Sequence, residues 1–86
     1  MTILDVRTKQ EYDQGHVDGA LWFDVQKLIA GELPPVSKDE ELVLYCRSGS
    51  RSQTAQGILE SNGFTHVRNA GGIAAMATAG HRIVIT

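Results

Sequence analysis

The sequence predicts an α/β fold built on a mostly parallel β-sheet. Short apolar runs of strand length alternate with segments that carry helix caps and helical spacing. Strands that alternate with helices are typical of β–α–β units, in which a crossing helix makes neighbouring strands parallel. No linker, repeat or low-complexity segment interrupts the chain, so residues 1–86 are expected to form a single domain.

Five segments are predicted to be strands, because each is a short run of apolar or β-branched residues. In order they are Ile3–Val6, Ala20–Phe23, Glu41–Tyr45, Thr65–Arg68 and the tail Arg82–Thr86. The third run is expected to lie centrally in the sheet. The segment Asn69–Gly72, which follows the fourth strand, is predicted to be a turn.

Four segments are predicted to be helices. In order they are Thr8–Gln14, the segment from the cap Asp24 to the stop Gly31, Arg51–Asn62 and Ile73–Thr78. Thr8 and Glu11 have the spacing of a capping box. The residues that share a helical face and should be buried are Val25, Leu28 and Ile29 in the second helix, and Ala55, Ile58 and Leu59 in the third.

Composition and charge exclude several classes of function. The formal net charge is −2 at pH 7, so no basic field draws the chain to nucleic acid or to an anionic membrane. No apolar run approaches the ~20 residues that a membrane-spanning helix needs. The single cysteine excludes an internal disulfide, and the three histidines are too scattered to complete a zinc site. Neither a metal nor another cofactor is therefore expected.

The segment Tyr45–Ser52 carries the strongest signal for chemistry. It joins a buried strand to an amphipathic helix, so Cys46 falls at the carboxyl end of a strand, where open α/β sheets bind ligands. The backbone N–H groups of the small residues after Cys46 can turn inward as an anion-binding nest, and the helix N-terminus faces the same point. Arg47 and Arg51 add positive charge. All of these features favour a thiolate over a thiol.

Cys46 is therefore predicted to be a catalytic nucleophile. An anionic substrate would be bound by the loop residues Arg47, Ser48, Gly49, Ser50 and Arg51. The simpler alternative is a buried cysteine in a glycine-rich turn from strand to helix. Two arginines beside one loop are costly to place for packing alone, which favours the catalytic interpretation.

The loop Cys46–Arg51 resembles the six-residue active-site loop of the rhodanese-type sulfurtransferases. Two further groups of residues resemble the family's signatures at either end of the domain. They are Asp5-Val6-Arg7, Glu11-Tyr12, Gly15-His16-Val17 and Gly19-Ala20 toward the amino terminus, and Gly63-Phe64, Val67 and Asn69–Ile73 toward the carboxyl terminus. Three motifs in the family's order cover nearly the whole chain.

The likeness is greatest to the small, stand-alone, exported type of rhodanese domain. Two departures from the wider family, the lack of a strand before Asp5 and Met76 near the place of a tryptophan, are also features of that type. The resemblance implies a rhodanese-like fold with helices on both faces of the sheet. It also implies a role in stress response, and it favours a periplasmic location for a chain that has lost its leader, with the cytoplasm as the alternative.

The resemblance further implies thiosulfate:cyanide sulfurtransferase activity. Cys46 would take the outer sulfur of a small anionic donor, thiosulfate, as a persulfide and pass it to a thiophilic acceptor. Loop N–H groups from Arg47 to Arg51 would hold that sulfur. Arg51 would also anchor the loop or neutralise the donor, and Arg47 would steer anions at the mouth. The simplest expectation for the oligomeric state of so short a chain is a monomer.

Two other functions are weighed against sulfur transfer. Cysteine-dependent phosphatases of related shape place five residues between the cysteine and an arginine, whereas four residues separate Cys46 from Arg51 here and Ser52 stands at the phosphatase position. The shorter loop favours sulfur over a phosphoryl group. Other rhodanese-like domains are non-catalytic binding or regulatory modules, but those commonly lose the cysteine.

The resemblance also implies roles for residues outside the loop. Asp5, Arg7, Glu11 and His16 are expected to form one charged network that braces the edge of the sheet. Trp22 and Phe23 are expected in the core, with a pocket-lining position as the alternative for one of them. The remaining expectations are exposed positions for His66 and His81 and a tight turn beside the loop at Gly71-Gly72.

Overall fold

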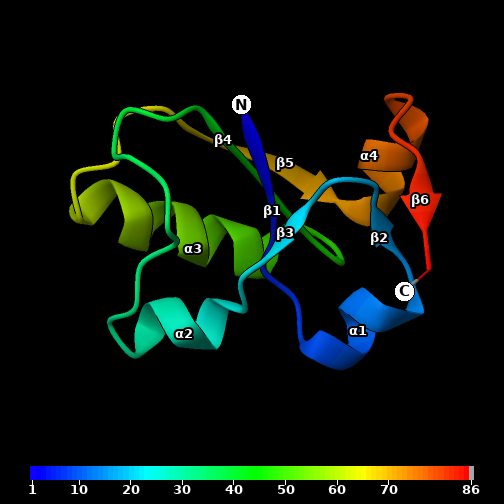
Figure 1. The fold of residues 1–86 in the computed structure, drawn as a ribbon, viewed down its shortest axis with the longest axis horizontal. Helices are drawn as coiled ribbons and strands as arrows, with labels where there is room; N and C mark the ends of the chain where they lie inside the picture. Colours follow the sequence, from blue (N-terminus) through cyan, green and yellow to red (C-terminus); the bar gives the residue numbers. More distant parts are fainter. Residues whose placement is uncertain (86) are drawn as a thin grey trace.

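Four parallel strands form the central sheet, in the order β3–β1–β4–β5 (Figure 1). The structure, a computed structural model, describes residues 1–85. The strands of this sheet are β1 (Thr2–Asp5), β3 (Leu21–Trp22), β4 (Leu42–Cys46) and β5 (Val67–Gly72). The predicted α/β class and the parallel sheet are confirmed.

Helices lie on both faces of the sheet. They are α1 (Lys9–Gln14), α2 (Val25–Ile29), α3 (Ser50–Ser61) and α4 (Ile73–Thr78). Helices α2 and α3 pack on one face and α4 packs on the other (Figure 1). Beside α4, two short strands, β2 (His16–Val17) and β6 (Ile83–Val84), pair antiparallel. Among residues 1–85, no helix combines the length and the apolar character needed to cross a membrane.

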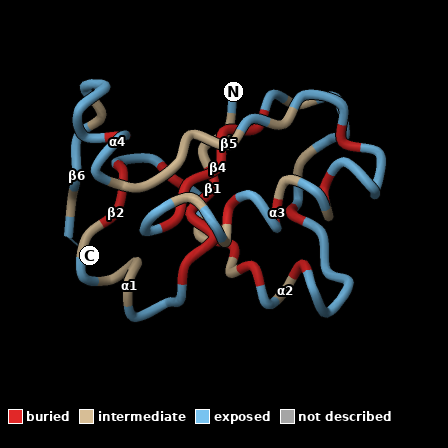
Figure 2. The backbone as a smooth tube through the Cα atoms, turned by 180° about the vertical axis from the view of Figure 1, so that it is seen from behind, coloured by how far each residue is buried: buried red, intermediate tan, exposed pale blue. Residues whose placement is uncertain are grey.

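Strand β4 separates two hydrophobic cores. Its side chains point alternately to the two faces of the sheet. Leu42, Leu44 and Cys46 belong to the core beneath α2 and α3, and Val43 and Tyr45 belong to the core beneath α4. All five residues are buried, and Figure 2 shows the buried backbone gathered where β1 and β4 cross the middle of the molecule. The alternation directs the Cys46 side chain toward α3.

Local signals determine where the first two helices begin. The Thr8 hydroxyl accepts a hydrogen bond from the Glu11 backbone N–H, and the Glu11 carboxylate accepts one from the Thr8 N–H, which confirms the capping box. Asp24 caps α2 by accepting a hydrogen bond from the Gln26 N–H at 2.9 Å. Helix α2 then buries Val25 and Leu28.

The structure corrects several expectations about strands. Strand β5 begins at Val67 and continues through Gly72, so the turn predicted at Asn69–Gly72 is wrong. These small residues keep pairing with β4, through an irregular register, up to the pair Cys46–Gly72. Strand β2 was not predicted, because two residues carry no periodic pattern. The predicted tail strand is confirmed at Ile83–Val84, while Thr86 lies outside the described residues.

The expectations for individual side chains met mixed outcomes. Phe23 is a core residue, but Trp22 is only half-buried, because its indole N–H donates to the Arg7 carbonyl and its ring lies against Lys27. Ile29 was expected in the core and is exposed, since α2 ends there. Of the two histidines expected in solvent, His66 is exposed and His81 is half-buried.

Candidate active site

Cys46 ends β4 with its side chain beneath the first turn of α3. Its residue is fully buried, and the Gly49 backbone N–H donates a hydrogen bond to Sγ at 3.0 Å. The Ser52 hydroxyl oxygen lies 3.4 Å from Sγ. Cys46 belongs to the core beneath α2 and α3, and the loop residues that follow it, Arg47 and Ser48, are exposed.

The surroundings of the sulfur favour the thiolate. Burial raises the pKa of the Cys46 thiol, but hydrogen bonds from the Ser52 hydroxyl and from the backbone N–H groups of Ser52, Gly49 and Ser48 outweigh it and hold the pKa below its usual value. The N-terminus of the 12-residue helix α3 adds its positive end to these donors. The surroundings of Cys46 therefore stabilise its thiolate form.

Gly49 gives the loop the shape that this arrangement requires. It is the N-cap of α3 and has φ +104°, in the left-handed region that side chains other than glycine rarely adopt. This turn directs the Gly49 N–H back at the Cys46 sulfur. Of the other predicted loop residues, Ser48 and Ser50 are exposed, and the structure gives their side chains no contact with Sγ.

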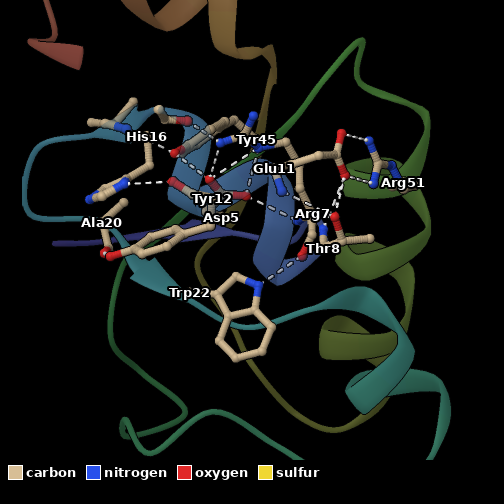
Figure 3. Close-up of polar contacts among 12 residues, drawn as sticks. Asp5, Arg7, Thr8, Glu11, Tyr12, His16, Ala20, Trp22, Tyr45 and Arg51 are labelled. Carbon is tan, nitrogen blue, oxygen red and sulfur yellow. Dashed lines mark hydrogen bonds and ion pairs between the residues drawn. The ribbon is translucent and has the colours of Figure 1, made fainter. Parts of the chain in front are cut away.

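Arg51 points away from the loop and binds Glu11 of α1. The two guanidinium N–H groups reach the two carboxylate oxygens at 2.7 and 2.9 Å, a bidentate pair between residues forty positions apart (Figure 3). This pairing favours the anchoring role predicted for Arg51 over the neutralising role, because its charge is already matched. The hydrogen bond from Arg51 is the largest influence on Glu11 and lowers the pKa of that carboxyl to about 2, although burial opposes it.

The Glu11–Arg51 pair predicts an acid-sensitive contribution to stability. The folded-state pKa of Glu11 lies below its unfolded value of about 4.5, so the pair stabilises the fold above that pH and loses its effect as the pH falls toward 2. We expect the stability difference between the wild type and Glu11→Gln, measured by urea unfolding, to shrink over this range. Arg51→Gln should give the same profile, because it removes the same pair. A difference that is constant with pH would contradict the assignment.

Asp5 and Arg7 form a second, buried ion pair. Arg7 Nη2 lies 2.6 Å from Asp5 Oδ2, and the Tyr45 hydroxyl donates to the same oxygen at 2.7 Å (Figure 3). Of the four residues predicted to form one charged network, Asp5 and Arg7 are joined directly by hydrogen bonds. Glu11 binds Arg51 instead, and His16 stacks on Tyr12 with ring centroids 3.7 Å apart. These contacts depend on side-chain directions that the sequence does not state.

A cavity of about 470 Å³ opens beside the loop. Its lining residues are Arg7, Glu11, Gln14, Gly15, Arg47, Ile73 and Ile83; Cys46 is not one of them. Arg7 and Glu11 are already paired, whereas Arg47 has no ion-pair partner among residues 1–85. Arg47 thus presents a free positive charge where the cavity meets the loop, as expected for a residue that draws anions.

Two polar residues beside the sulfur were missed as site residues. Ser52 is fully buried in the first turn of α3, and Asn69 of β5 contacts it across the loop. In the sequence, Ser52 stands only at the position of the phosphatase arginine, and Asn69 is predicted to belong to a turn. A hydroxyl six residues after the cysteine, on the helix face that carries Ala55 and Leu59, was the available signal.

Gly72 lets β5 approach the loop more closely than a side chain would allow. A Cβ atom there would lie 2.4 Å from the Arg47 carbonyl oxygen, although its φ of −100° suits any residue. We expect Gly72→Ala to destabilise the fold by about 1–3 kcal/mol and to change the alkylation rate of Cys46.

Gly57→Ala is the matched control for this exchange. A Cβ atom at Gly57 would meet no atom of residues 1–85 within 4 Å, and its helical position should make the exchange neutral or stabilising by about 0.5–1 kcal/mol. Urea unfolding of both variants checks the prediction. Equal stabilities of Gly72→Ala and Gly57→Ala would show that the contact with Arg47 is not tight.

The fold and the site together define an α/β domain with one cysteine, whose thiolate form is stabilised at the carboxyl end of a parallel strand. Residues 1–79 match the Rhodanese-like domain family, and the chain belongs to that family. It is 40% identical over 73 residues to the thiosulfate sulfurtransferase PspE of Escherichia coli, covering 81% of this chain and 68% of that protein. It is also 40% identical over 83 residues to a sulfurtransferase of Allochromatium vinosum, covering 95% and 77%.

Solved structures agree with the sequence relatives. A rhodanese-like domain from Anabaena superposes with a TM-score of 0.88 at 30% identity, over 99% of both chains. A rhodanese with anions from Escherichia coli superposes with a TM-score of 0.83 at 33% identity, over 99% of this chain and 98% of the other. The rhodanese-like fold predicted from the sequence motifs is thus confirmed.

Proposed function

We propose that this protein is a thiosulfate sulfurtransferase that carries sulfur as a persulfide on Cys46. The main support is the buried Cys46 sulfur, which accepts hydrogen bonds from the loop and lies at the N-terminus of α3. A thiolate is the form of cysteine that attacks sulfur. A relative named as a thiosulfate sulfurtransferase, 40% identical to this chain, suggests the donor.

The proposed reaction has two steps. The Cys46 thiolate attacks the outer sulfur of thiosulfate; the new S–S bond forms as the donor's S–S bond breaks, and sulfite leaves with its electron pair. A thiophilic acceptor such as cyanide then attacks the outer sulfur of the persulfide. Thiocyanate forms, and the electron pair of the broken bond returns to Cys46 as the thiolate. Both steps place negative charge on sulfur beside the same donors.

The loop residues have separate roles in this proposal. Backbone N–H groups of the loop from Arg47 to Arg51 hold the outer sulfur of the persulfide, as oxyanion-hole donors stabilise oxygen. Arg47 draws the anionic donor from the cavity. Arg51 holds the loop in place through Glu11.

Mass spectrometry after incubation with thiosulfate tests the proposal. We expect the intact chain to gain the mass of one sulfur, on its only cysteine, and to lose it on addition of cyanide with release of thiocyanate. A phosphate ester is assayed in parallel. Rapid ester hydrolysis with no sulfur adduct would favour the phosphatase alternative. A folded chain with no adduct and no turnover would favour a binding module.

The two arginines should respond differently to substitution. Arg51→Ala breaks the contact between α1 and α3, so we expect the larger loss, mainly in kcat. Arg47→Ala removes only a free charge, so we expect a few-fold rise in KM for thiosulfate that fades with added salt. Steady-state kinetics at low and high ionic strength measure both. Equal losses in the same constant would show that both residues merely supply charge.

The remaining proposals concern the state of the protein in the cell. We propose a monomer in the periplasm, without a metal or cofactor, on the strength of the resemblance to small exported rhodanese domains. Sedimentation analysis and fractionation of cells that carry the complete gene check the two statements. Material confined to the cytoplasmic fraction would overturn the periplasmic location.

A further inference from the structure

Ser52 has one hydroxyl hydrogen and three neighbouring acceptors. Its oxygen lies 3.4 Å from Cys46 Sγ, 2.7 Å from Asn69 Oδ1 and 3.1 Å from the Gly49 carbonyl oxygen. The residue is fully buried, so no solvent contact substitutes for a missing bond. A hydroxyl donates one hydrogen bond at a time. Ser52 must therefore choose among these acceptors, and the charge on the sulfur decides which it prefers.

The orientation of the Asn69 amide is fixed by its other contacts. Its Oδ1 accepts a hydrogen bond from the Gly71 N–H at 2.8 Å, and its Nδ2 donates to the Gly49 carbonyl at 3.1 Å. Oδ1 must therefore be the atom that faces Ser52. When Cys46 is a neutral thiol, its S–H can donate to Ser52 while Ser52 donates to Asn69. When Cys46 is a thiolate, the stronger bond is from Ser52 to the charged sulfur.

We propose that Ser52 is a further catalytic residue, which turns its hydroxyl hydrogen between Cys46 Sγ and Asn69 Oδ1 as sulfur is taken up and released. The inference rests on the proposed function. In the resting enzyme Ser52 donates to the thiolate. After sulfite leaves, the negative charge lies on the outer sulfur, Sγ is neutral, and the hydroxyl turns to Asn69. No covalent bond of Ser52 forms or breaks.

The main consequence falls on the second step of the reaction. When the acceptor attacks the outer sulfur, Sγ leaves as a thiolate, and a thiol of lower pKa leaves faster. Ser52 stabilises this leaving group by turning back to it. Arg51 of α3 and Glu11 of α1 form an ion pair near the sulfur. This pair keeps the same charges during the uptake and the release of sulfur.

The exchange Ser52→Ala isolates the hydroxyl, because every group that loses Ser52 keeps another partner. Asn69 Oδ1 keeps the Gly71 N–H, the Gly49 carbonyl keeps the Gln53 N–H and the Asn69 amide, and Sγ keeps the Gly49 N–H. The side chain loses only its oxygen, so the packing is preserved. We expect this variant to fold and to form the persulfide.

Two measurements on the full chain test the proposal. In the first, the rate of alkylation of Cys46 by iodoacetamide is followed against pH; its midpoint should move to higher pH in Ser52→Ala. In the second, persulfidated protein is freed of thiosulfate and mixed with cyanide; discharge in one turnover should slow about tenfold, the size expected for a hydrogen bond to a charged group. Ser52→Thr keeps the hydroxyl, so it should have the alkylation midpoint and the discharge rate of the wild type. Thr54→Ala, an exposed exchange on the same helix, should alter neither.

Asn69→Ala is expected to shift the alkylation midpoint of Cys46 in the direction opposite to Ser52→Ala. Without the competing acceptor, the Ser52 hydroxyl is more available to the sulfur, so the alkylation midpoint should move to lower pH. A purely structural role would move both variants in the same direction. If Asn69→Ala does not fold, Ser52→Ala and Ser52→Thr decide the question by themselves.

The results of these experiments distinguish a failure of the role of Ser52 from a failure of the proposed sulfurtransferase function. An unchanged midpoint and an unchanged discharge rate in Ser52→Ala would overturn the role of Ser52 and leave the sulfurtransferase intact. Failure of the wild type to form a persulfide would overturn the sulfurtransferase. The alkylation arm needs no sulfur donor, so it would still report whether Ser52 stabilises the thiolate.

Discussion

Cys46→Ser is expected to abolish sulfur transfer while leaving the fold unchanged. A serine hydroxyl is not ionised near neutral pH and cannot form a persulfide, so the covalent route is lost. We expect formation of thiocyanate from thiosulfate and cyanide to fall on the order of a thousandfold or more, as when a covalent nucleophile is removed from other enzymes. Colorimetric thiocyanate assays in multiple and single turnover measure the loss.

The serine is chosen because it preserves the surroundings of the sulfur. Its oxygen can accept the hydrogen bond from the Gly49 N–H and can contact Ser52, so the loop keeps its polar partners. The urea midpoint should therefore stay close to that of the wild type. Thr54→Ala, on the exposed side of α3, controls for the handling of variants and should keep wild-type turnover.

The chain has one cysteine, which makes the experiment decisive. No other thiol can take over the sulfur, and any adduct on the wild type can be assigned without mapping. Retention of more than about a tenth of wild-type turnover in Cys46→Ser would mean that transfer proceeds without a covalent intermediate on this residue. The proposal would then have to be abandoned, whatever the mass of the wild type showed.

Local signals explain why much of the site could be predicted from the sequence. The capping box of Thr8 and Glu11 and the glycine at the start of α3 act within a few residues, so their sequence spacing already states their geometry. The position of Cys46 follows from a short buried strand and the helix after it. Such features need no knowledge of distant partners.

The contacts that were missed join residues far apart in the chain. Glu11 and Arg51 are forty positions apart and meet only because α1 lies beside the start of α3 (Figure 3). Asn69 looks like a turn residue until its strand is placed beside β4, where its side chain reaches Ser52. Strand β2 exists because it pairs with β6 and because the Val17 N–H donates to the Tyr45 hydroxyl. A pattern of two residues cannot predict that β2 pairs with β6 and contacts Tyr45.

Asp5→Ala is expected to cause the largest loss of stability of any exchange outside the loop. Asp5 is fully buried at the end of β1, where its carboxylate accepts hydrogen bonds from the Arg7 guanidinium and from the Tyr45 hydroxyl. The same hydroxyl accepts one from the Val17 N–H, so the carboxylate connects β1, β4 and β2. Its loss leaves the Tyr45 hydroxyl without its acceptor and leaves the buried Arg7 guanidinium with only the neutral Gly15 carbonyl oxygen.

The expected size follows from the state of Arg7. This side chain is also buried; burial lowers the pKa of its guanidinium, but the hydrogen bonds and the charge of Asp5 outweigh that effect and keep the group charged. Removing one partner of a buried ion pair costs about 3–5 kcal/mol. A chain of 86 residues has roughly 4–13 kcal/mol of total stability, so this loss is a large fraction of it. Urea unfolding at neutral pH measures the difference.

Two comparisons identify the cause of the loss. Asp13→Ala breaks the exposed Lys9–Asp13 pair, which has the same 2.6 Å separation as Arg7–Asp5, and should cost less than about 1 kcal/mol. The double variant Asp5→Ala with Arg7→Met removes both buried charges and should recover part of the stability, because no unpaired charge remains. If Asp5→Ala and Asp13→Ala destabilise the protein equally, the burial of the Asp5–Arg7 pair has no energetic role, and the strands around it must be held by packing alone.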